Sequence, residues 1–502
     1  MEKCYRAIQN KFIKNKKLYV SLNNNYRLKL KDKFLQKEIP VLNPNDLFRF
    51  QKLQIINKGN ENGELILIQN KNELLTKNLK NKIVLLAIDV LEMPVCKAII
   101  TTNFQTPLSH ISILAQNRGI PVLAYPNGLK DSVLLKLINK NVCLKITKSE
   151  YEINECKLKY KEVKRKKERV LKANKEYKKL KNAKYIYLKD KNIYGSKVVN
   201  FSELKRVAKR NYSTPEGAFG IPFYYYNQHV SSIKIKTEID KLLKDTLLLD
   251  NREQLNKRLK IIRKLIKKQP LDKNLLAKVN FKIDTTKHRK RFRFRSSSNA
   301  EDITGFNGAG LYTSKTGVIE DSVKTIEKAI KKVWASVWTL RAFEEREYFN
   351  INQKSVSMGI LVHRSFPDDY MNGVAITKNL YRNYQKGFVI NNQIGEHKVV
   401  DNEKGNNSEQ IISYYNSKSQ FYNQKDAVEY IATSNLNDYK PILTQKEIFE
   451  LTQELEKIKR HFYRKFRGTN YKNFALDIEF KLANNLQGEC KLYVKQVRLF
   501  DR

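Results

Sequence analysis

The sequence has little of what marks a secreted, membrane-spanning or metal-stapled protein. Its 502 residues include only five cysteines, which are widely spaced and form no Cys-x-x-Cys pair. The odd count and the spacing favour neither a disulfide framework nor a zinc site, and they indicate a reducing compartment. The longest apolar stretch, near residues 83–95, contains Asp89 and Glu92 and is too short to span a bilayer. Because the first residues lack an apolar targeting segment, we expect a cytoplasmic protein with no membrane partner.

Acidic residues are also scarce. The chain has 97 Lys and Arg against 51 Asp and Glu, a net charge of +46. Such a charge would ordinarily suggest nucleic acid, but lysine is spread through every segment, and no motif for reading bases accompanies it. The densest basic run, residues 157–184, contains no Gly or Pro and predicts a basic helical connector. We therefore do not predict nucleic acid as a partner.

Short apolar runs divide the chain. Residues 1–60 show no clear motif, and after them come five runs bounded by turn residues that predict buried strands: 65–68, 83–88, 98–101, 121–124 and 142–146. After the connector, a second α/β unit begins near residue 186. It has helical segments near 239–268 and 326–349, strands near 357–362 and 373–377, and a hairpin-like pair at 475–482 and 491–499. The predicted division is 1–60, 61–150, 151–185 and 186–502.

One histidine stands where a loop turns into a short amphipathic helix. Ser109 is placed to cap this helix, and Gly119 to end it. His110 would then lie at the helix N-terminus, where unpaired backbone N–H groups and the helix dipole favour an anion and a neutral ring. A histidine there can carry a phosphoryl group, although a bare Ser-His pair before a helix is more often a capping or partly buried residue.

A second segment combines a cation, hydroxyls and glycines. Arg295 is followed by three serines and an Asn-Ala-Glu-Asp stretch, and then by Gly305, Gly308 and Gly310. A triphosphate needs a fixed cation, hydroxyl donors and backbone N–H groups that can approach closely. The glycines alone would be weak evidence. Together with the arginine and the serines, they indicate a phosphate site.

Two carboxylates near the end of the chain alternate along a predicted strand. Asp477 and Glu479 would face one side and can hold Mg²⁺ against phosphate oxygens, with Gln496 on the partner strand completing the shell. Alone, the two carboxylates would be read as a solvated strand face. The closing Gln-x-Arg pattern of Gln496 and Arg498 favours the metal site.

The histidine segment resembles the phosphohistidine swivelling domain of the family that includes phosphoenolpyruvate synthase, pyruvate phosphate dikinase and the glucan water dikinases. That family carries a Thr-x-x-Ser/Cys-His element ahead of an Ala-Arg-x-x-Gly-Ile-Pro element. The matching residues here are Thr106, Ser109, His110, Ala115, Gly119, Ile120 and Pro121. In two departures, Phe104-Gln105 replaces the usual glycine pair, and Gln116 stands at the arginine position, with Arg118 displaced by two residues.

The arginine-serine-glycine segment resembles the ATP-grasp-type ATP-binding domain of the same family. Lys197 lies in a segment similar to the family's Gly-Gly-Lys start, whose lysine contacts ATP. Arg341 lies in a Trp-Ala-Ser … Arg-Ala stretch that the resemblance implies binds ATP, although an arginine there can also simply lie along the core. The resemblance implies ATP and Mg²⁺ as cofactors, with Lys197, Arg295 and Arg498 neutralising charge on the transferred group.

The resemblance implies an α/β chain in which a phosphohistidine swivelling β/α domain precedes an ATP-grasp-type domain, joined by the basic helical connector. It implies a dikinase-type phosphotransferase: ATP phosphorylates His110 from its β-phosphate, giving AMP and phosphate, and His110 swings on the connector before passing the group to an acceptor. The domain order is that of the glucan water dikinases. No stretch long enough for a phosphoenolpyruvate/pyruvate barrel remains.

The acceptor is not evident; a glucan, pyruvate and small alcohols are candidates, and a partner chain can carry the acceptor site. Three alternatives stay open: a phosphoenolpyruvate/pyruvate enzyme whose barrel is a separate chain, a non-catalytic ATP-binding regulator motivated by the departures at Gln116 and Phe104-Gln105, and a polyanion-binding protein driven by charge. The remaining histidines are expected to be surface or satisfied polar residues: His229, His288, His363, His397 and His461.

Overall fold

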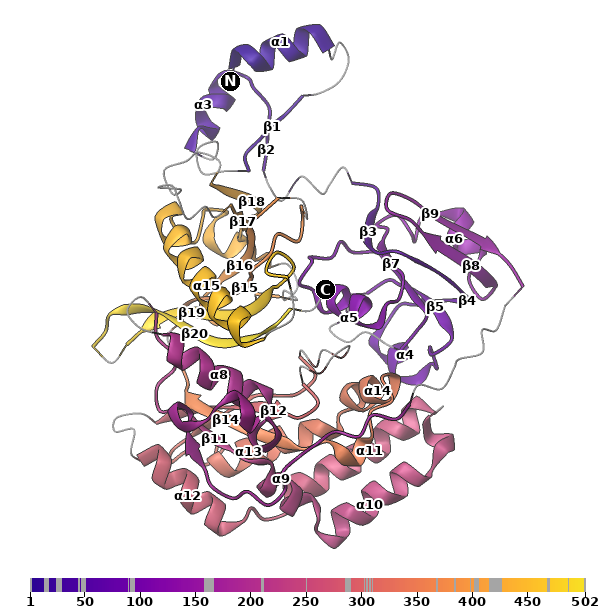
Figure 1. Ribbon diagram of the computed structural model, residues 1–502. Helices are drawn as coiled ribbons and strands as arrows, with labels where there is room; N and C mark the ends of the chain where they lie inside the picture. Colours follow the sequence, from indigo (N-terminus) through magenta and orange to yellow (C-terminus); the bar gives the residue numbers. More distant parts are fainter. Residues whose placement is uncertain are drawn as a thin grey trace. The chain divides into compact units, whose positions relative to one another are not determined.

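The computed structural model describes residues 2–12, 18–23, 29–43, 46, 51–88, 90, 95–157, 167–208, 212–249, 251–284, 290–301, 303, 306, 308, 310–366, 369–382, 385–397, 399–400, 406–414, 427–466, 470–485 and 487–500. The chain forms two compact units (Figure 1). Unit 1 comprises Met1–Lys52, Asp368–Val494 and Leu499–Asp501. Unit 2 comprises Leu53–Pro367, Lys495–Arg498 and Arg502.

The first part of unit 2, here the seven-stranded lobe (residues 54–156), has a sheet of order β3-β7-β6-β5-β4-β8-β9, whose four strands from β7 to β4 pair in parallel. One face packs against α4 (Lys71–Thr76) and α5 (His110–Arg118), and the other against α6 (Ser132–Lys136). The five predicted strands are confirmed, and β9 continues the sheet past residue 150. The strands are β3 (Gln54–Asn57), β4 (Gly59–Ile68), β5 (Lys82–Leu86), β6 (Ala98–Thr101), β7 (Val122–Ala124), β8 (Asn141–Ile146) and β9 (Tyr151–Glu155).

A disulfide joins Cys143 and Cys156, although the spacing of the cysteines favoured no disulfide framework. The two residues are 13 apart in sequence, and the β8–β9 hairpin brings their Cα atoms to 5.7 Å. Cys143 pairs with Asn154 across the hairpin, so Cys156, two residues further on, lies diagonally beside it without any Cys-x-x-Cys motif. The inference of a reducing compartment therefore loses its support. Cys4, Cys96 and Cys490 are free thiols.

The second part of unit 2, here the five-stranded lobe (residues 167–366), has an antiparallel sheet of order β10-β11-β14-β12-β13. Helices α10 to α13 pack on one face, and α8 covers the other. The strands are β10 (Lys181–Asn182), β11 (Phe219–Ile221), β12 (Arg291–Ser298), β13 (Lys315–Val318) and β14 (Met358–Arg364). The helices are α7 (Lys191–Tyr194), α8 (Ser196–Val207), α9 (Phe223–Val230), α10 (Ile233–Lys244), α11 (Arg252–Lys268), α12 (Lys273–Asp284), α13 (Ile326–Ala335) and α14 (Leu340–Tyr348), with short 3₁₀ turns η2 (Ala183–Tyr185), η3 (Leu188–Asp190), η4 (Thr246–Leu249), η5 (Ser336–Trp338) and η6 (Gln353–Ser355).

The predicted connector is not helical in residues 167–180, which have no regular secondary structure apart from a bridge at Arg169, so that the helix expected across 151–185 is wrong there. The backbone N–H of Arg169 donates to the carbonyl of Asn350 at 2.8 Å, and its carbonyl accepts from Asn352 at 3.0 Å. The N–H of Leu171 donates to the Ser355 hydroxyl at 3.0 Å. Because the five-stranded lobe satisfies these backbone groups, the segment gains its hydrogen bonds without a helix.

Both predicted long helical stretches are interrupted. The stretch near 326–349 turns at η5, and α14 starts anew where the Thr339 hydroxyl accepts the N–H of Ala342. The stretch near 239–268 breaks between α10 and α11, where the Asn251 side chain accepts the N–H of Gln254. Short polar side chains cap a new helix in both places, a local competition that apolar periodicity does not reveal. Arg341 thereby becomes the second residue of its own helix.

Unit 1 holds a six-stranded sheet in which β18, β17, β16, β15 and β19 pair antiparallel in that order and β20 follows at the edge. The predicted pair at 475–482 and 491–499 is confirmed as β19 and β20. The described N-terminal residues form a small cluster of their own around Tyr5, Leu22, Phe34 and Ile39. The elements are α1 (Glu2–Phe12), β1 (Val20–Ser21), α3 (Lys31–Gln36), β2 (Val41–Leu42), β15 (Asp369–Ile376), β16 (Phe388–Ile394), β17 (Glu409–Ser413), β18 (Val428–Ala432), η8 (Asn435–Asn437), α15 (Gln445–Lys465), β19 (Leu476–Asn484) and β20 (Cys490–Leu499).

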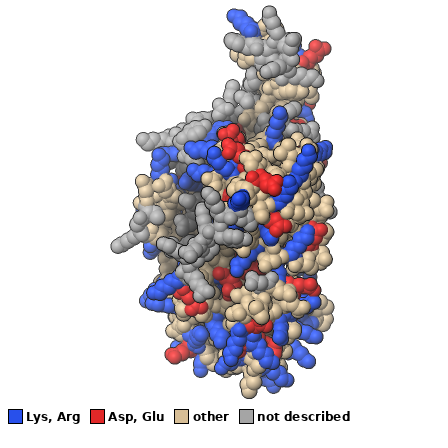
Figure 2. Space-filling view, turned by 90° about the vertical axis from the view of Figure 1, so that its right-hand side faces the viewer, with Lys and Arg blue, Asp and Glu red and all other residues tan. Residues whose placement is uncertain are grey.

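The charge is dispersed on the face that Figure 2 shows. Lys and Arg side chains are spread over it, and Asp and Glu side chains lie among them. On this face the positive charge does not gather into one stripe of the kind that tracks a nucleic acid backbone. Among the described residues, no helix combines the length and apolar character needed to cross a membrane.

Candidate active site

His110 is the first residue of α5, as predicted. The hydroxyl of Ser109 caps the helix by accepting the N–H of Ser112 at 3.1 Å. Gly119 ends it in the left-handed conformation at φ 68°. The positive end of the helix dipole therefore lies at His110, where it favours an anion.

The loop before this helix is held although it lacks the glycine pair of the resembled family. The side chain of Gln54 forms a reciprocal pair with the backbone of Gln105, accepting its N–H and donating to its carbonyl, both at 2.8 Å. Gln116, at the displaced arginine position, has an amide oxygen that is buried and accepts no hydrogen bond from the described residues. The departures thus change how the loop is fixed without removing the helix start.

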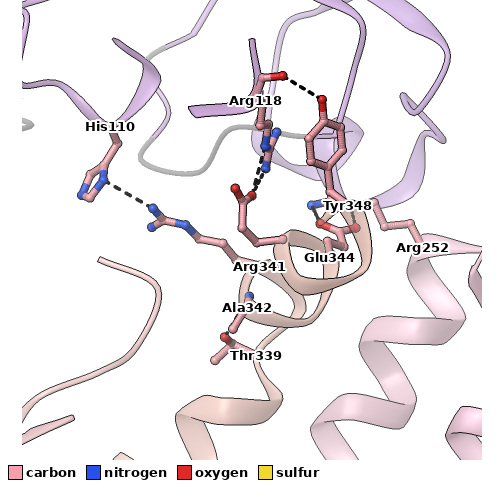
Figure 3. Close-up of polar contacts among 9 residues, drawn as sticks. His110, Arg118, Arg252, Thr339, Arg341, Ala342, Glu344 and Tyr348 are labelled. Atoms are coloured by element: carbon pink, nitrogen blue, oxygen red, sulfur yellow. Dashed lines mark hydrogen bonds and ion pairs between the residues drawn. The ribbon is translucent and has the colours of Figure 1, made fainter. Parts of the chain in front are cut away.

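Arg341 contacts His110 directly (Figure 3). Its Nη2 lies 3.3 Å from Nδ1 of the imidazole. A guanidinium group has donors and no acceptor, so Nδ1 must present its lone pair to Arg341. Arg341 thereby fixes the orientation of the imidazole at the start of α5.

Gly310 lies against the same ring. It has a φ of +69°, and a β-carbon placed on it would lie 2.4 Å from Cε1 of His110. Only glycine fits there with the ring in its present place. Gly308 lies close to Glu301, since its β-carbon would be 3.0 Å from Cγ of that residue. Gly305 lies outside the described residues. The glycine segment therefore reaches the histidine.

Lys197, at the start of α8, lies at the end of strand β12. Its Nζ donates to the Ser296 hydroxyl at 3.1 Å and to Oε1 of Glu301 at 3.0 Å. The Ser297 hydroxyl accepts the N–H of Val198 at 3.1 Å, which fixes the helix start on the strand. The lysine, the serines and the start of the glycine segment are thus in one place, as the phosphate-site prediction requires.

Arg295, also on β12, contacts β20. Its Nη2 donates to Oε1 of Gln496 at 2.8 Å, and its Nη1 to the carbonyl of Lys495 at 3.4 Å. Gln496 is buried, and Arg498 follows two residues later on the same side of the strand. The structure thus uses the amide oxygen of Gln496 for Arg295, whereas its role as a metal ligand stays a prediction.

Asp477 and Glu479 belong to β19 of unit 1. Their neighbours Leu476, Ile478 and Phe480 are all fully buried, so the carboxylates lie on the opposite face of the strand. Among the described residues, no three His, Cys, Asp or Glu side chains are grouped to hold a metal by themselves. Two carboxylates suit Mg²⁺ all the same, because it takes one or two protein carboxylates and fills the remaining positions with phosphate oxygens and water.

Three buried polar residues near the site were not predicted. Arg346 is fully buried, donating to Oε1 of Gln353 at 2.7 Å and to the carbonyl of Val337 at 2.8 Å. Arg118, noted only as displaced from a family position, forms an ion pair with Glu345, 227 residues away. No local pattern identifies the Arg118–Glu345 pair, since it depends on which helices meet.

Two of the remaining histidines are buried, and His363 is only partly satisfied, since its Nε2 has no hydrogen-bond partner among the described residues. The ring of His229 pairs with the carbonyl of Ile266 at 2.9 Å, and that of His363 with the carbonyl of Arg364 at 2.6 Å. Burial lowers the pKa of both, and with the nearby Arg295 cation it brings the pKa of His363 to about 3. His288 lies outside the described residues.

Comparison with known proteins assigns the C-terminal part of the chain. The family described as pyruvate phosphate dikinase, AMP/ATP-binding domain, matches residues 191–501, a range that contains Lys197, Arg295 and Arg341 but not His110. A phosphoenolpyruvate synthase of Aeropyrum pernix is 25% identical over 177 residues, which are 34% of this chain and 21% of that protein. The chain thus spans about a fifth of the length of this curated relative. Because the match covers more than half of its residues, the chain belongs to the pyruvate phosphate dikinase AMP/ATP-binding family.

Proposed function

We propose that this chain is an ATP-dependent phosphotransferase of the dikinase type that phosphorylates its own His110. The observation that carries the proposal is the contact of His110 with two elements of the matched range, Arg341 and Gly310. Lys197 and Arg295 lie in the same unit, on or beside the strand that leads into the glycine segment. A capped histidine, a glycine segment and fixed cations are the groups that phosphoryl transfer from ATP requires.

In the proposed reaction, a ring nitrogen of His110 attacks the β-phosphorus of ATP. The N–P bond forms while the bond from the β-phosphorus to the bridging oxygen breaks, and that oxygen leaves with AMP. Water then releases the γ-phosphate, so that ATP and water give AMP, phosphate and phosphohistidine. The attacking nitrogen needs a lone pair, which a neutral ring supplies.

The charged residues have separate tasks in this proposal. Lys197, Arg295 and Arg498 neutralise the charge that develops on the phosphoryl oxygens. Asp477 and Glu479 would hold Mg²⁺, which when bound would draw charge from the phosphates. Arg341 contacts Nδ1 of His110 and would orient the ring.

The connector limits how His110 can travel. Because residues 169–182 are bonded to the five-stranded lobe, the length of chain between the two lobes is residues 157–168 rather than 151–185. Twelve residues reach at most about 40 Å when fully extended. The proposed swing of the seven-stranded lobe must stay within that reach.

No single acceptor is assigned for the second half-reaction. A glucan, pyruvate and small alcohols are the candidates, and a barrel on a separate chain would make pyruvate the acceptor. Mass spectrometry of products after challenging the phosphoenzyme with each compound identifies it. A cytoplasmic location stays a prediction.

Labelling with β-³²P-ATP tests the proposed first half-reaction. The wild-type protein should retain label on His110 and release AMP, whereas His110→Ala should retain none. His397→Ala, which changes an exposed histidine, is the matched control and should label like the wild type. Label retained in His110→Ala would refute the assignment, and a wild type that binds ATP but never forms AMP would make the protein a regulator instead.

A further inference from the structure

One helix of the five-stranded lobe contacts both ends of α5. At the first residue of α5, His110 meets Arg341, and at the last, Arg118 meets Glu345 and Tyr348 (Figure 3). Arg341, Glu345 and Tyr348 are four and three residues apart on α14, the spacing of one helix face. His110 and Arg118 are eight residues apart, which is about 12 Å along α5. Arg341 and Tyr348 are seven residues apart, which is about 10 Å along α14. The two contacts therefore have nearly the same spacing on both helices.

The contact at the end of α5 is the more deeply buried of the two. Nε of Arg118 donates to Oε2 of Glu345 at 3.0 Å, its Nη2 forms an ion pair with the same oxygen, and the two side chains are 2% and 1% exposed. The Arg118 guanidinium lies 5.5 Å from the centre of the Tyr348 ring. The Tyr348 hydroxyl donates to the backbone carbonyl of Arg118 at 3.0 Å, an oxygen that the helix itself leaves unsatisfied. The carboxylate of Glu345 and both the ring and the hydroxyl of Tyr348 therefore all contact Arg118.

A buried ion pair of this kind sets position more than it adds affinity. Removing two charges from water offsets most of the attraction between them, whereas a register error that separates them leaves each charge buried and unpaired. When the two lobes separate, both charges return to water and that penalty disappears. The pair therefore favours one docked register and still permits release.

We infer that Arg118 and Glu345, here the docking pair, are positioning residues that set the register of α5 on α14 and so hold His110 against Arg341 and Gly310. The chemical consequence of this inference rests on the proposed function. The docking pair lies at the opposite end of α5 from His110, where its contacts are with each other and with Tyr348, so it acts through the placement of the helix. Docking itself can be measured without any phosphoryl transfer.

The test combines a distance with a rate. Spin labels at Val133→Cys and Val323→Cys, exposed positions on the two lobes, report docking after Cys4→Ser and Cys490→Ser remove the exposed thiols. Arg118→Gln and Glu345→Gln should each broaden the single distance distribution of the parent. Each should also slow His110 phosphorylation at saturating ATP by at least about tenfold, with the Kd for ATP within about twofold of the parent value.

Two further variants separate positioning from stability. The charge exchange Arg118→Glu with Glu345→Arg should recover the narrow distribution and most of the rate. Arg252→Gln breaks the ion pair of the neighbouring Glu344 inside the five-stranded lobe and should leave both unchanged. Single docking-pair variants that behave like Arg252→Gln, or that lose rate only through weaker ATP binding, would overturn the inference. A parent protein that is never phosphorylated refutes the proposed function, while the distance distributions still decide the docking pair.

Discussion

Gly310 and His110 are so close that the space beside the ring excludes a β-carbon. The position has a φ of +69°, and an added β-carbon would lie 2.4 Å from Cε1 and 3.2 Å from Nε2 of the imidazole. The only way to relieve that clash is to move the ring or the loop. The structure therefore couples the conformation of the glycine segment to the place of the histidine.

Gly310→Ala should displace His110 without unfolding the protein. Since a displacement of about 1 Å can cost 10²-fold in rate, we expect His110 labelling from ATP to slow by about 10- to 100-fold. Gly119→Ala is the matched control, because Gly119 has almost the same φ, 68°, and nothing within 4 Å of the added carbon. Both variants carry similar backbone strain, about 1 kcal/mol, so equal labelling rates would contradict the steric coupling.

Lys197→Met should weaken ATP binding and also destabilise the protein, for separate reasons. The lysine supplies a cation for phosphate, and it neutralises Glu301, whose side chain is 3% exposed. The double variant Lys197→Met with Glu301→Gln should restore the thermal midpoint and leave ATP affinity reduced by at least about tenfold. Calorimetric titration and thermal unfolding measure the two effects. Recovery of ATP binding in the double variant would remove Lys197 from the nucleotide site.

Local sequence signals predicted the elements around His110. Continuous apolar runs predicted β5, β6 and β7 because these parallel strands are buried on both faces, whereas β8 is antiparallel and buries alternate residues. The helix start and stop at Ser109 and Gly119 followed from side-chain capping and the left-handed backbone that glycine accepts. These features depend on residues close in sequence, which is why they could be read without a structure.

The failures concern partners distant in sequence. The absence of Gly and Pro predicted a helix after residue 156, but the backbone of Arg169 and Leu171 finds its hydrogen bonds on residues 350–355. Apolar periodicity predicted one helical segment near 326–349 and missed the break at η5, because it does not detect the Thr339 cap. Glu345 could not be paired with Arg118 until α5 and α14 were placed side by side. Such contacts follow from the tertiary arrangement and leave no local pattern.

The thiols should react in three stages. Two exposed cysteines, Cys4 and Cys490, should react with a thiol reagent in the native protein. Cys96 should react only on unfolding, because burial shields it and raises its pKa to about 12. Cys143 and Cys156 should add two thiols after reduction. Counts of two, three and five are therefore expected; five thiols in the unfolded, unreduced protein would rule out the disulfide.

The stability of unit 1 should fall as pH rises because of Glu409. This carboxyl on β17 is fully buried, and burial raises its pKa to about 7 from an ordinary 4.5, although it accepts hydrogen bonds from Asn392 at 3.1 Å and from the N–H of Ile442 at 2.9 Å. A raised folded-state pKa gives stability that is complete below the unfolded-state value and lost as pH rises through 7. Ionisation of Glu409 should thus lower the unfolding free energy by about 2–3 kcal/mol between pH 5 and 8.

Glu409→Gln should remove that pH dependence. The amide can accept from Ile442 and donate to Asn392 if the Asn392 amide rotates, and Oδ1 of Asn392 accepts no hydrogen bond from the described residues at present. The difference in unfolding free energy between variant and wild type, measured by urea at each pH, isolates this one group from all others that titrate. From pH 5 to 8, the unfolding free energy of the variant relative to the wild type should rise by about 2–3 kcal/mol. A difference that stays constant would mean that Glu409 is already ionised at pH 5, and that its two donors outweigh the effect of burial.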